Sequence, residues 1–560
     1  MLNTRLVSSM EKCFLDSEIE QFPSYEGCTA MRGMQTSFQL LYRESDTRST
    51  VPYSNMLGFR YSGELAPYTR ARAVELIPST MPVYPGLVDD NYLRTQPGLY
   101  PDLLREMHYR GSVPLFSGQA RALWFDVLVP ENAPLCSGKH TVEIEIYRKD
   151  EELGEGEVLA RHSFTVELLD LSMPERDFPV TQWLHCDCLA DYYNVPVFSE
   201  EHWRIIENFV KLAVKNGNTM LLTPVFTPPL DTEVGTERPT VQLVDVILTG
   251  GSYSFGYEKL DRWLDMCRRV GVRYYEISHL FSQWGARYAP KVVALVDGTE
   301  KRIFGWDTEG TGEEYVRFMD AFLPDFLAHM KAIGEDKKCF FHISDEPTVN
   351  SIDGYRRARD VVKRHLEGYT VMDALSSYDF YELGLVETPI PSNDHMQSFI
   401  ENKVENLWTY YCCGQTVGVS NRMFAMPGWR TRYMGVQMYY YNIKGFLQWG
   451  YNFYYSRRST DLINPFIETT GDGFFPSGDG FSVYPASDGT ALESVRIRHF
   501  CEGLDDMRLC RYAESLVGRD AIISLIESIF GKVDFKVCPR SREPILKLRE
   551  RLFEIIKKNK

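Results

Sequence analysis

The feature that most constrains the fold is a strand–helix rhythm that begins near residue 180. Short apolar runs alternate there with amphipathic helical patterns, an order typical of α/β proteins with a parallel sheet. Strands are expected at 181–189, 219–223, 273–280, 339–344, 370–375, 389–395, 407–412 and 445–454. Eight strand–helix units predict a closed (β/α)8 barrel, whose active face lies at the C-terminal strand ends.

The first third of the chain follows a different pattern. Strand-like pieces recur between turn signals, at 38–42, 71–77, 122–129, 141–147 and 163–168. Without long helical patterns between them, these pieces predict an antiparallel β-sandwich. We therefore expect a β-sandwich domain over 1–172, a catalytic (β/α)8 TIM barrel over 178–516, and a C-terminal helical extension over 517–560 packed on the barrel.

Two adjacent carboxylates, Asp345 and Glu346, follow the fourth expected strand and precede Pro347. Each carboxylate prefers hydration and like charges raise each other's pKa, so a buried strand end is a costly place for the pair. A fold keeps such a pair where a ligand or a reaction uses it. Paired carboxylates carry out glycoside hydrolysis. The alternative is that Asp345 or Ser344 caps the helix that follows.

Three stretches give the chain a resemblance to a known family, namely HISDEP at 342–347, ALWFDV at 122–127 and GDGFSVYP at 478–485. Over most of its length it resembles glycoside hydrolase family 123, β-N-acetylgalactosaminidases with a β-sandwich ahead of a (β/α)8 barrel, and related glycoside-hydrolase-like proteins. In that family the adjacent Asp and Glu act in substrate-assisted catalysis. The resemblance therefore implies that Asp345 and Glu346 are catalytic.

The seventh expected strand leads to the same mechanism. A retaining glycosidase usually has a nucleophilic carboxylate about 5 Å from its acid/base, and barrel glycosidases with Asn-Glu-Pro after strand four take it from the end of strand seven. Here that strand ends in WTYYCC at 408–413, and Glu405 lies at its beginning. The carbonyl oxygen of a substrate 2-acetamido group can replace the nucleophile. We expect ionised Asp345 to accept the acetamido N–H, and Glu346 to act as general acid and then base.

Other candidate substrate-binding residues lie near expected strand ends or in loops on the same face. They are His185, Asp187, Trp284, Tyr410, Tyr411, Trp449, Asp479 and Tyr484. His185 and Asp187 either bind sugar hydroxyls or are satisfied core residues. One of Tyr410 and Tyr411 is expected to face the site and the other the core, because strand neighbours alternate. Trp284 and Trp449 are stacking surfaces or packing residues, and Asp479 and Tyr484 close over a sugar or belong to an ordinary turn.

Composition excludes several function classes. The net charge of −16 argues against a nucleic-acid or anionic-membrane surface, and no run approaches the length of a membrane span. No phosphate loop, dinucleotide fingerprint or metal spacing occurs, so we expect no cofactor and no metal. The 12 cysteines show no CxxC, and Cys412 and Cys413 are expected on opposite faces of a strand. With no apolar segment after a basic start, a cytoplasmic protein is expected.

These observations predict a retaining exo-β-N-acetylhexosaminidase that acts on a glycan or glycoconjugate with a terminal β-linked N-acetylhexosamine. The preference for N-acetylgalactosamine rests on the resemblance. One alternative is a glycoside hydrolase of other specificity that pairs Glu346 with a further carboxylate. The other is a non-catalytic carbohydrate-binding protein, against which the retained carboxylate pair argues.

Overall fold

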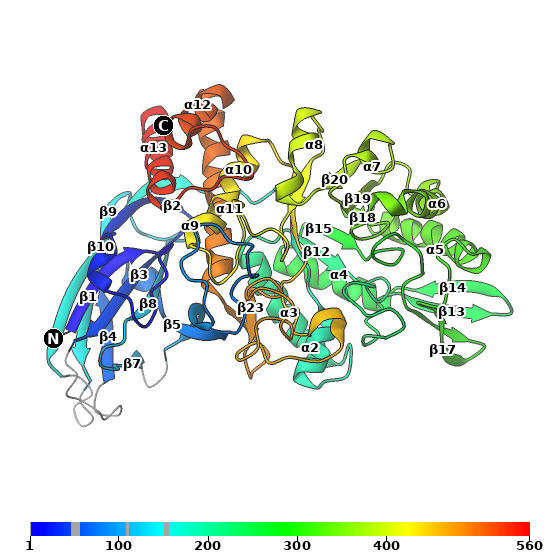
Figure 1. Cartoon of the computed structure of the whole chain (residues 1–560), viewed down its shortest axis with the longest axis horizontal. Coiled ribbons are helices and arrows are strands. Elements are labelled where there is room, and N and C mark those ends of the chain that lie inside the picture. The colour runs from blue at the N-terminus through cyan, green and yellow to red at the C-terminus, as the bar shows by residue number, and fades with distance from the viewer. Residues whose placement is uncertain (1, 46–55, 108–110, 150–155) are drawn as a thin grey trace. The chain divides into compact units, whose positions relative to one another are not determined.

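The computed structural model describes residues 2–45, 56–107, 111–149 and 156–560 (Figure 1). The chain divides into two compact units. Unit 1 comprises Met1–Glu175, Ser420–Tyr440 and Leu492–Lys560, and unit 2 comprises Arg176–Val419 and Tyr441–Ala491. Within the described ranges, no helix is both long and apolar enough to span a lipid bilayer.

Unit 1 contains two five-stranded sheets. The first has the order β1-β3-β8-β5-β6 and is antiparallel throughout, with strands β1 (Leu2–Ser8), β3 (Gln35–Glu44), β5 (Thr69–Ser79), β6 (Gly98–Glu106) and β8 (Arg121–Leu128). The second has the order β2-β10-β9-β4-β7, with strands β2 (Gly27–Arg32), β4 (Met56–Ser62), β7 (Ser112–Pro114), β9 (Gly138–Arg148) and β10 (Val158–Ser172). Of the strand pairs described in this second sheet, β2–β10 is parallel and the others are antiparallel.

Aromatic side chains join the two sheets of unit 1. Phe38 on β3 stacks on Phe164 of β10 with ring centroids 3.9 Å apart, and Phe125 on β8 contacts Tyr61 of β4. Along β9, buried residues alternate with more exposed ones, as expected for a strand with one covered face. The predicted strands of this third of the chain are confirmed in β3, β5, β8, β9 and β10.

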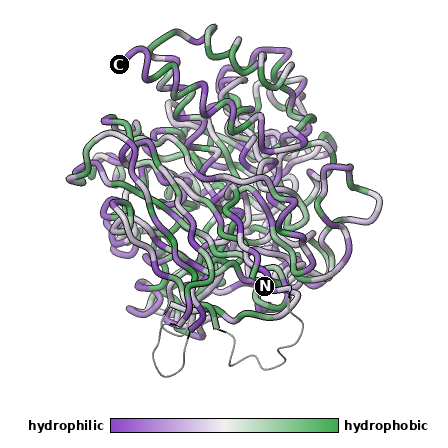
Figure 2. Tube along the Cα trace, turned by 90° about the vertical axis from the view of Figure 1, so that its left-hand side faces the viewer, coloured by the Kyte–Doolittle hydropathy of each residue, from purple (hydrophilic) through white to green (hydrophobic). Residues whose placement is uncertain are grey.

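Among the described residues, α-helices from the later part of the chain also belong to unit 1. They are α9 (Gly428–Arg432), α10 (Met434–Tyr440), α11 (Val495–Val517), α12 (Arg519–Phe530) and α13 (Glu543–Asn559), and β24 (Ala491–Glu493) precedes α11. Apolar residues of α13 recur with helical spacing, and the tube near the C-terminus alternates between hydrophobic and hydrophilic segments (Figure 2). The buried Arg496 of α11 forms a bidentate ion pair with Asp102 of β6, at 2.7 and 2.9 Å.

This grouping differs from the predicted domain division. The prediction assigns 420–440 and 492–516 to the barrel and packs 517–560 on it, whereas the contacts group all of these residues with the N-terminal sheets. The physical reason is the buried ion pairing between distant segments, such as Arg496 with Asp102 and Arg542 with Glu11. The helical period of α11 does not reveal which partner its buried arginines take.

Substitution of Arg72 on β5 tests how much a buried ion pair contributes to the stability of unit 1. The Arg72 guanidinium pairs with Asp126 and Glu493, and all three side chains are almost fully buried. Because Arg72→Met removes the cation that forms an ion pair with each of the two buried carboxylates, we expect it to lower the free energy of unfolding by about 3–5 kcal/mol. The matched control is Arg70→Met, which removes an exposed pair with Glu106 and should cost about 0–1 kcal/mol. Urea unfolding measures both, and equal small losses would contradict this reading.

Unit 2 is built on short parallel strands. The first sheet has the order β12-β15-β18-β19-β20, with β12 (Met220–Thr223), β15 (Tyr274–Ile277), β18 (Cys339–Phe341), β19 (Thr370–Ala374) and β20 (Thr388–Ile390). The second has the order β11-β22-β21, with β11 (Val180–Gln182), β21 (Trp408–Tyr410) and β22 (Gly445–Gln448). Thr219 N donates to Val180 O, and a parallel bridge joins Ser392 to Tyr410. The two sheets therefore adjoin at both of their edges.

Helices follow most of these strands in chain order. They are α2 (Cys186–Tyr193), α3 (Glu200–Lys215), α4 (Glu258–Val270), α5 (Glu313–Ala332), α6 (Ile352–Lys363), α7 (Asp379–Glu382) and α8 (Gln397–Glu401). A separate sheet of order β14-β13-β16-β17 contains β13 (Asp245–Thr249), β14 (Ser252–Gly256), β16 (Val292–Val296) and β17 (Thr299–Phe304). The strand β23 (Val483–Pro485) lies in the long segment after β22.

The first predicted strand of unit 2 is too long. Residues 181–189 were expected to be extended, but β11 ends at Gln182 and α2 begins at Cys186. This run is buried on all sides, and a buried helix and a buried strand have the same apolar pattern over so few residues. The other seven predicted strands coincide with β12, β15, β18, β19, β20, β21 and β22, although each is shorter than expected.

Candidate active site

Unit 2 contains a cavity of about 170 Å³ whose wall includes the carboxylate pair. Its lining comprises Trp183, Leu230, Asp231, Gln283, Trp284, Asp345, Glu346, Ala374, Tyr410, Cys412, Cys413, Leu447, Trp449, Phe474 and Phe475. Ala374 and Tyr410 end β19 and β21, and the pair follows β18. The cavity thus lies at the C-terminal ends of the parallel strands, where ligands bind in α/β folds.

Irregular backbone brings both carboxylates into this cavity. Strand β18 ends at Phe341, and Glu346 has a left-handed φ of 43°, a sparsely populated conformation for a non-glycine residue. The turn is fixed by hydrogen bonds from Glu346 N to Ala374 O (3.0 Å) and from Trp284 N to Asp345 O (2.7 Å). Neighbouring side chains of a strand would diverge, whereas this turn lets both line one cavity.

The two carboxyl groups have different surroundings. Burial, followed by the charge of Glu346, raises the pKa of Asp345 well above its usual value, while the charge of His342 opposes this shift. Glu346 accepts a hydrogen bond of 2.5 Å from the Tyr410 hydroxyl. The two adjacent carboxyl groups therefore lie in distinct environments within one cavity.

A buried network lies behind the pair. His342 contacts Glu276 Oε1 at 2.8 Å and Asp373 Oδ1 at 3.1 Å, and all three side chains are fully buried. Burial alone would lower the pKa of His342, but the hydrogen bonds to Asp373 and Glu276 raise it to about 9. Asp373 also accepts the backbone N–H groups of Ile343 (3.0 Å) and Ser344 (3.3 Å). An imidazolium and a carboxylate therefore support the turn that carries Asp345.

His279 stacks on His342, with ring centroids 4.2 Å apart and planes at 21°. Within the described part of the chain, Asp373 completes a cluster of three groups with these histidines, and both ring nitrogens of His279 lack a hydrogen-bond partner. A metal bound to imidazole lies in the ring plane, so the lone pairs of two stacked rings run side by side without converging. Both nitrogens of His342 are also engaged. This arrangement suits a supporting network better than a metal site.

Three of the predicted substrate-binding residues line the cavity. Tyr410 donates to Glu346, and Trp449 is half-buried in the wall. Trp284 is 47% exposed at the cavity rim and also has a left-handed φ, of 60°. An aromatic ring that lines the cavity while remaining exposed is a suitable stacking surface for a sugar.

Three other predicted residues lie behind Trp449 instead of in the cavity lining. Asp479 is fully buried and accepts a hydrogen bond of 3.1 Å from Trp449 Nε1. His185 Nε2 lies 2.8 Å from Trp449 O, and its Nδ1 lies 3.2 Å from Arg238 Nη2. Burial and the Arg238 charge lower the pKa of His185 to about 3, so the ring is neutral and donates through Nε2. Asp187 pairs with the same guanidinium at 2.6 and 2.8 Å.

Tyr411 and Tyr484 are core residues. Tyr411 packs on Phe446 with ring centroids 5.0 Å apart, so of the two neighbouring tyrosines it is Tyr410 that lines the cavity. Tyr484 contacts the rings of Phe466 and Phe481. Both tyrosines are buried, and the cavity lining includes neither, because adjoining aromatic side chains cover them.

Sequence reasoning missed two polar residues of the lining, Asp231 and Gln283. Asp231 follows β12 in a long loop with a left-handed φ of 39°, and its N–H donates to Gln283 Oε1 at 2.6 Å. Burial raises the pKa of the Asp231 carboxyl. A lone carboxylate in a loop has no period or motif that marks it, so only the fold reveals its place. Of the described residues, the carboxylates in the lining are thus Asp231, Asp345 and Glu346.

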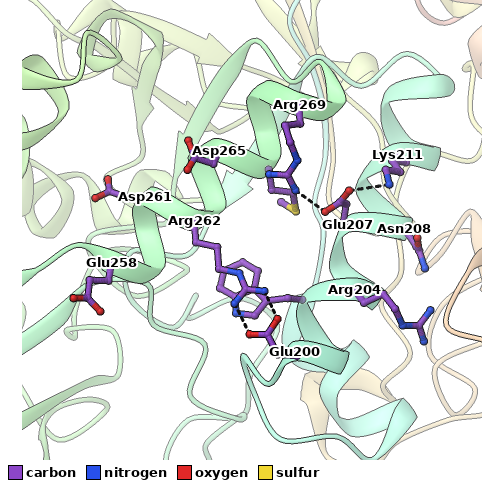
Figure 3. A pocket seen from close by; sticks show the side chains of 12 residues that line it. Glu200, Arg204, Glu207, Asn208, Lys211, Glu258, Asp261, Arg262, Asp265 and Arg269 are labelled. Atoms are coloured by element: carbon purple, nitrogen blue, oxygen red, sulfur yellow. Dashed lines mark hydrogen bonds and ion pairs between the residues drawn. The ribbon is translucent and has the colours of Figure 1, made fainter.

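A larger hollow of about 660 Å³ lies between α3 and α4, away from the carboxylate pair. Several of its charged side chains are paired with one another, as Figure 3 shows for Glu200 with Arg262 and for Glu207 with Arg269 and Lys211. Such i,i+4 and cross-helix pairs are typical of a solvated helix surface. Size alone therefore does not identify the functional site.

The sequence profile described as "Glycoside hydrolase 123, catalytic domain" matches residues 183–513. These residues include the whole cavity lining and more than half of the chain. The chain belongs to glycoside hydrolase family 123. As a family 123 member it is a glycoside hydrolase, and its substrates are glycans.

A solved structure of a family 123 protein has a similar fold. A family 123 glycoside hydrolase from Clostridium perfringens, solved in a study of glycolipid glycan hydrolysis, is 15% identical with a TM-score of 0.72, and the match covers 100% of this chain and 98% of that one. An FMN-binding β-glucuronidase from Facaelibacterium prausnitzii L2-6 is 10% identical over 82% of this chain and 60% of that one, with a TM-score of only 0.27. No curated protein sequence matches the chain.

Proposed function

We propose that this family 123 hydrolase is a retaining exo-β-N-acetylhexosaminidase that uses the 2-acetamido group of its substrate as the nucleophile. The observation that carries the proposal is the pair Asp345–Glu346 in one cavity, to which the end of β21 contributes a tyrosine instead of a glutamate. Adjacent carboxylates on one turn cannot act from opposite sides of a sugar ring. One of them can contact the acetamido group while the other contacts the leaving oxygen of the same sugar.

In this mechanism the acetamido carbonyl oxygen bonds to the anomeric carbon while the bond to the leaving oxygen breaks. Glu346 transfers its proton to that leaving oxygen. Ionised Asp345 accepts the acetamido N–H and stabilises the positive charge that spreads over the closing ring. In the second half, Glu346 removes a proton from water, which attacks the anomeric carbon and reopens the ring. Two inversions at one carbon give net retention.

The cavity dimensions support an exo-acting enzyme. About 170 Å³ is below the range of about 300–1,000 Å³ that is typical for drug-sized ligands, so the site fits one sugar residue better than a chain. Trp449 and Trp284 offer apolar faces for a pyranose ring. A β-linked N-acetylgalactosamine residue is the proposed terminal sugar, because the chain belongs to family 123.

We also propose that unit 2 is a (β/α)8 barrel and that unit 1 includes a β-sandwich. The order of the eight parallel strands along the chain supports the barrel, as do the hydrogen bond from Thr219 to Val180 and the bridge from Ser392 to Tyr410. The aromatic contacts between the two sheets of unit 1 support the sandwich. The TIM-barrel arrangement accounts for an active site at the C-terminal strand ends.

Asp231 supports a second candidate, a glycosidase of other specificity that forms a covalent intermediate. It is the third carboxylate of the cavity, and its Oδ2 accepts only a backbone hydrogen bond, from Arg458 N at 3.1 Å, among the contacts described for that atom. If Asp231 is the nucleophile, Glu346 keeps its role as acid/base and the substrate needs no acetamido group.

Fluorinated substrates separate the two candidates. Replacing the acetyl hydrogens by one, two or three fluorines withdraws electrons from the carbonyl oxygen. If that oxygen attacks, kcat/KM for aryl N-acylgalactosaminides should fall with each added fluorine. The largest of these steps should be about tenfold or more. A 2-fluoro galactoside should leave no covalent adduct. A flat series together with an adduct on Asp231, detected by mass spectrometry of peptides, would establish the second candidate instead.

His342 provides a pH test of the proposed role of Asp345. The pKa of Asp345 is raised by burial and by Glu346, Asp373 and Asp231, and it is lowered by the His342 charge. His342→Gln removes that cation, so the pKa of Asp345 should rise further. We expect the acidic limb of the kcat/KM profile to move up by about one pH unit, or about 1.4 kcal/mol.

The control for this test is His365→Gln, which removes the contact of His365 with Asp320 outside the cavity. In this variant the acidic limb of the kcat/KM profile should lie at the same pH as in the wild type. A purely structural role for His342 would lower kcat/KM equally at every pH, and that result would contradict the electrostatic role.

A further inference from the structure

Two adjacent cysteines, Cys412 and Cys413, lie in the wall of the active-site cavity. Sequence alternation placed them on opposite faces of a strand. Strand β21 ends at Tyr410, however, and the pair belongs to the irregular turn that follows, where alternation no longer applies. Both side chains are half-buried thiols outside any disulfide, and both line the same cavity.

The two thiols contact each other. A hydrogen bond with Cys413, then burial, then the charges of Cys413, Glu346 and Asp479, raise the pKa of the Cys412 thiol well above its usual value. Cys412 Sγ also lies 3.2 Å from Gln415 Oε1, which accepts the Cys412 N–H at 2.9 Å. At neutral pH Cys412 is therefore a protonated thiol held beside its neighbour, and not the thiolate that a nucleophilic cysteine needs.

A direct disulfide between these neighbours is unfavourable. Consecutive Cα atoms lie about 3.8 Å apart across a trans peptide, whereas the Cα atoms of disulfide partners usually lie about 4.4–6.8 Å apart. A larger atom that bonds to both sulfurs closes a wider ring. The pair is thus better suited to hold a bridging centre than to form its own bond.

We propose that Cys412 and Cys413 form a bidentate binding site for a monosubstituted trivalent arsenical, and that its binding blocks the sugar cavity. Thiol sulfur is a soft ligand that selects soft centres. Among the described residues, no third histidine, cysteine or carboxylate joins the pair in a ligand cluster, so a suitable centre must be satisfied by two protein sulfurs. An arsenical whose third bond is to carbon meets this condition.

The binding step is a ligand exchange without oxidation or reduction. An arsenical R–As(OH)2 forms two As–S bonds and loses two As–O bonds. The two thiol protons leave with the hydroxyl groups as two water molecules, and the arsenic stays trivalent. Protonated thiols are therefore adequate reactants, and the bond from Cys412 to Gln415 is given up in the process.

The bound group would occupy the space that a sugar needs. The same cavity of about 170 Å³ is lined by both cysteines, by Glu346 and Tyr410, and by Trp449. Substrate and arsenical should therefore exclude each other. The other cysteine pair of unit 2, Cys186 and Cys188, is fully buried at the start of α2 and should not compete for the reagent.

Phenylarsine oxide is the probe for this site. With the full-length protein, we expect intact-mass measurement to show a phenylarsenic adduct and thiol titration to show two fewer reactive thiols. Hydrolysis of whichever chromogenic glycoside the enzyme accepts should fall at least tenfold. A dithiol should restore it, and a monothiol at equal thiol concentration should not. The mass and thiol measurements need no activity, so they test the site even if the proposed function is wrong.

The variants Cys412→Ser and Cys413→Ser should each lose the adduct. With activity expressed relative to each untreated variant, inhibition by phenylarsine oxide should be at least tenfold weaker than in the wild type. The matched control, Cys136→Ser, removes the exposed cysteine of unit 1 and should keep wild-type sensitivity. Adduct formation in both Ser variants would overturn the proposal, as would reversal by a monothiol. If two reactive thiols are lost but the protein mass shows no phenylarsenic adduct, the proposal is also overturned, because the pair would then have formed a disulfide.

Discussion

Replacing Glu346 by Gln should lower kcat/KM for a glycoside with a poor leaving group by about 10²–10⁴-fold. An alkoxide leaving group needs a proton as the glycosidic bond breaks, and Gln has none to give. For an activated aryl glycoside, which departs with little protonation, the loss in the first step should be much smaller. The ratio of the two losses, measured with one aryl and one alkyl N-acetylgalactosaminide, reports the acid role directly.

The Tyr410 hydroxyl makes this substitution a mild structural change. It donates to Glu346 Oε1 at 2.5 Å, and an amide oxygen can accept the same bond, so the turn should be retained. The matched control is Glu405→Gln, an exposed glutamate at the opposite end of β21 that the seventh-strand argument rejected as nucleophile. It should leave both rates unchanged. Equal losses on both substrates in Glu346→Gln would remove Glu346 from the role of acid.

The strands around the site could be predicted because burial leaves a sequence pattern. The apolar run before Asp345 corresponds to β18, and the runs at 219–223 and 370–375 correspond to β12 and β19. The same reasoning fails at 181–189, where the run contains the first turn of α2. An element buried on every side has no polar face, so its period cannot separate helix from strand.

The site itself could be predicted only in part. Asp345, Glu346, Tyr410 and Trp449 stand at strand ends, which topology brings to one edge. Asp231 enters the lining through a left-handed loop residue, and its neighbour Gln283 is brought to it by the fold alone. For His185, Asp187 and Asp479 the sequence left sugar binding and a structural role open; in the fold His185 and Asp479 contact Trp449, and Asp187 pairs with Arg238. The residue type predicts that a side chain makes polar contacts, but the partner in those contacts depends on the fold.

Asp345→Asn should lower kcat by about 10²–10³-fold while the protein stays folded, since the side chains have the same shape. The amide can turn its oxygen toward the acetamido N–H, but it has no negative charge to stabilise the closing ring. The raised pKa of Asp345 adds a second expectation. Wild-type activity should fall as the pH drops through that pKa, because the protonated carboxyl is as neutral as Asn. The variant should therefore lose the acidic limb of the wild-type profile.

The matched control for Asp345→Asn is Asp231→Asn, the same change at the third carboxylate of the cavity. If the acetamido oxygen is the nucleophile, Asp231 serves in binding, so its loss should raise KM and leave kcat within about tenfold. If Asp231 is the nucleophile, its variant should be the inactive one, and Asp345→Asn should keep most of its kcat. Because the two outcomes are opposite for the same pair of proteins, steady-state kinetics with one chromogenic N-acetylgalactosaminide decides between an intramolecular and an enzymatic nucleophile.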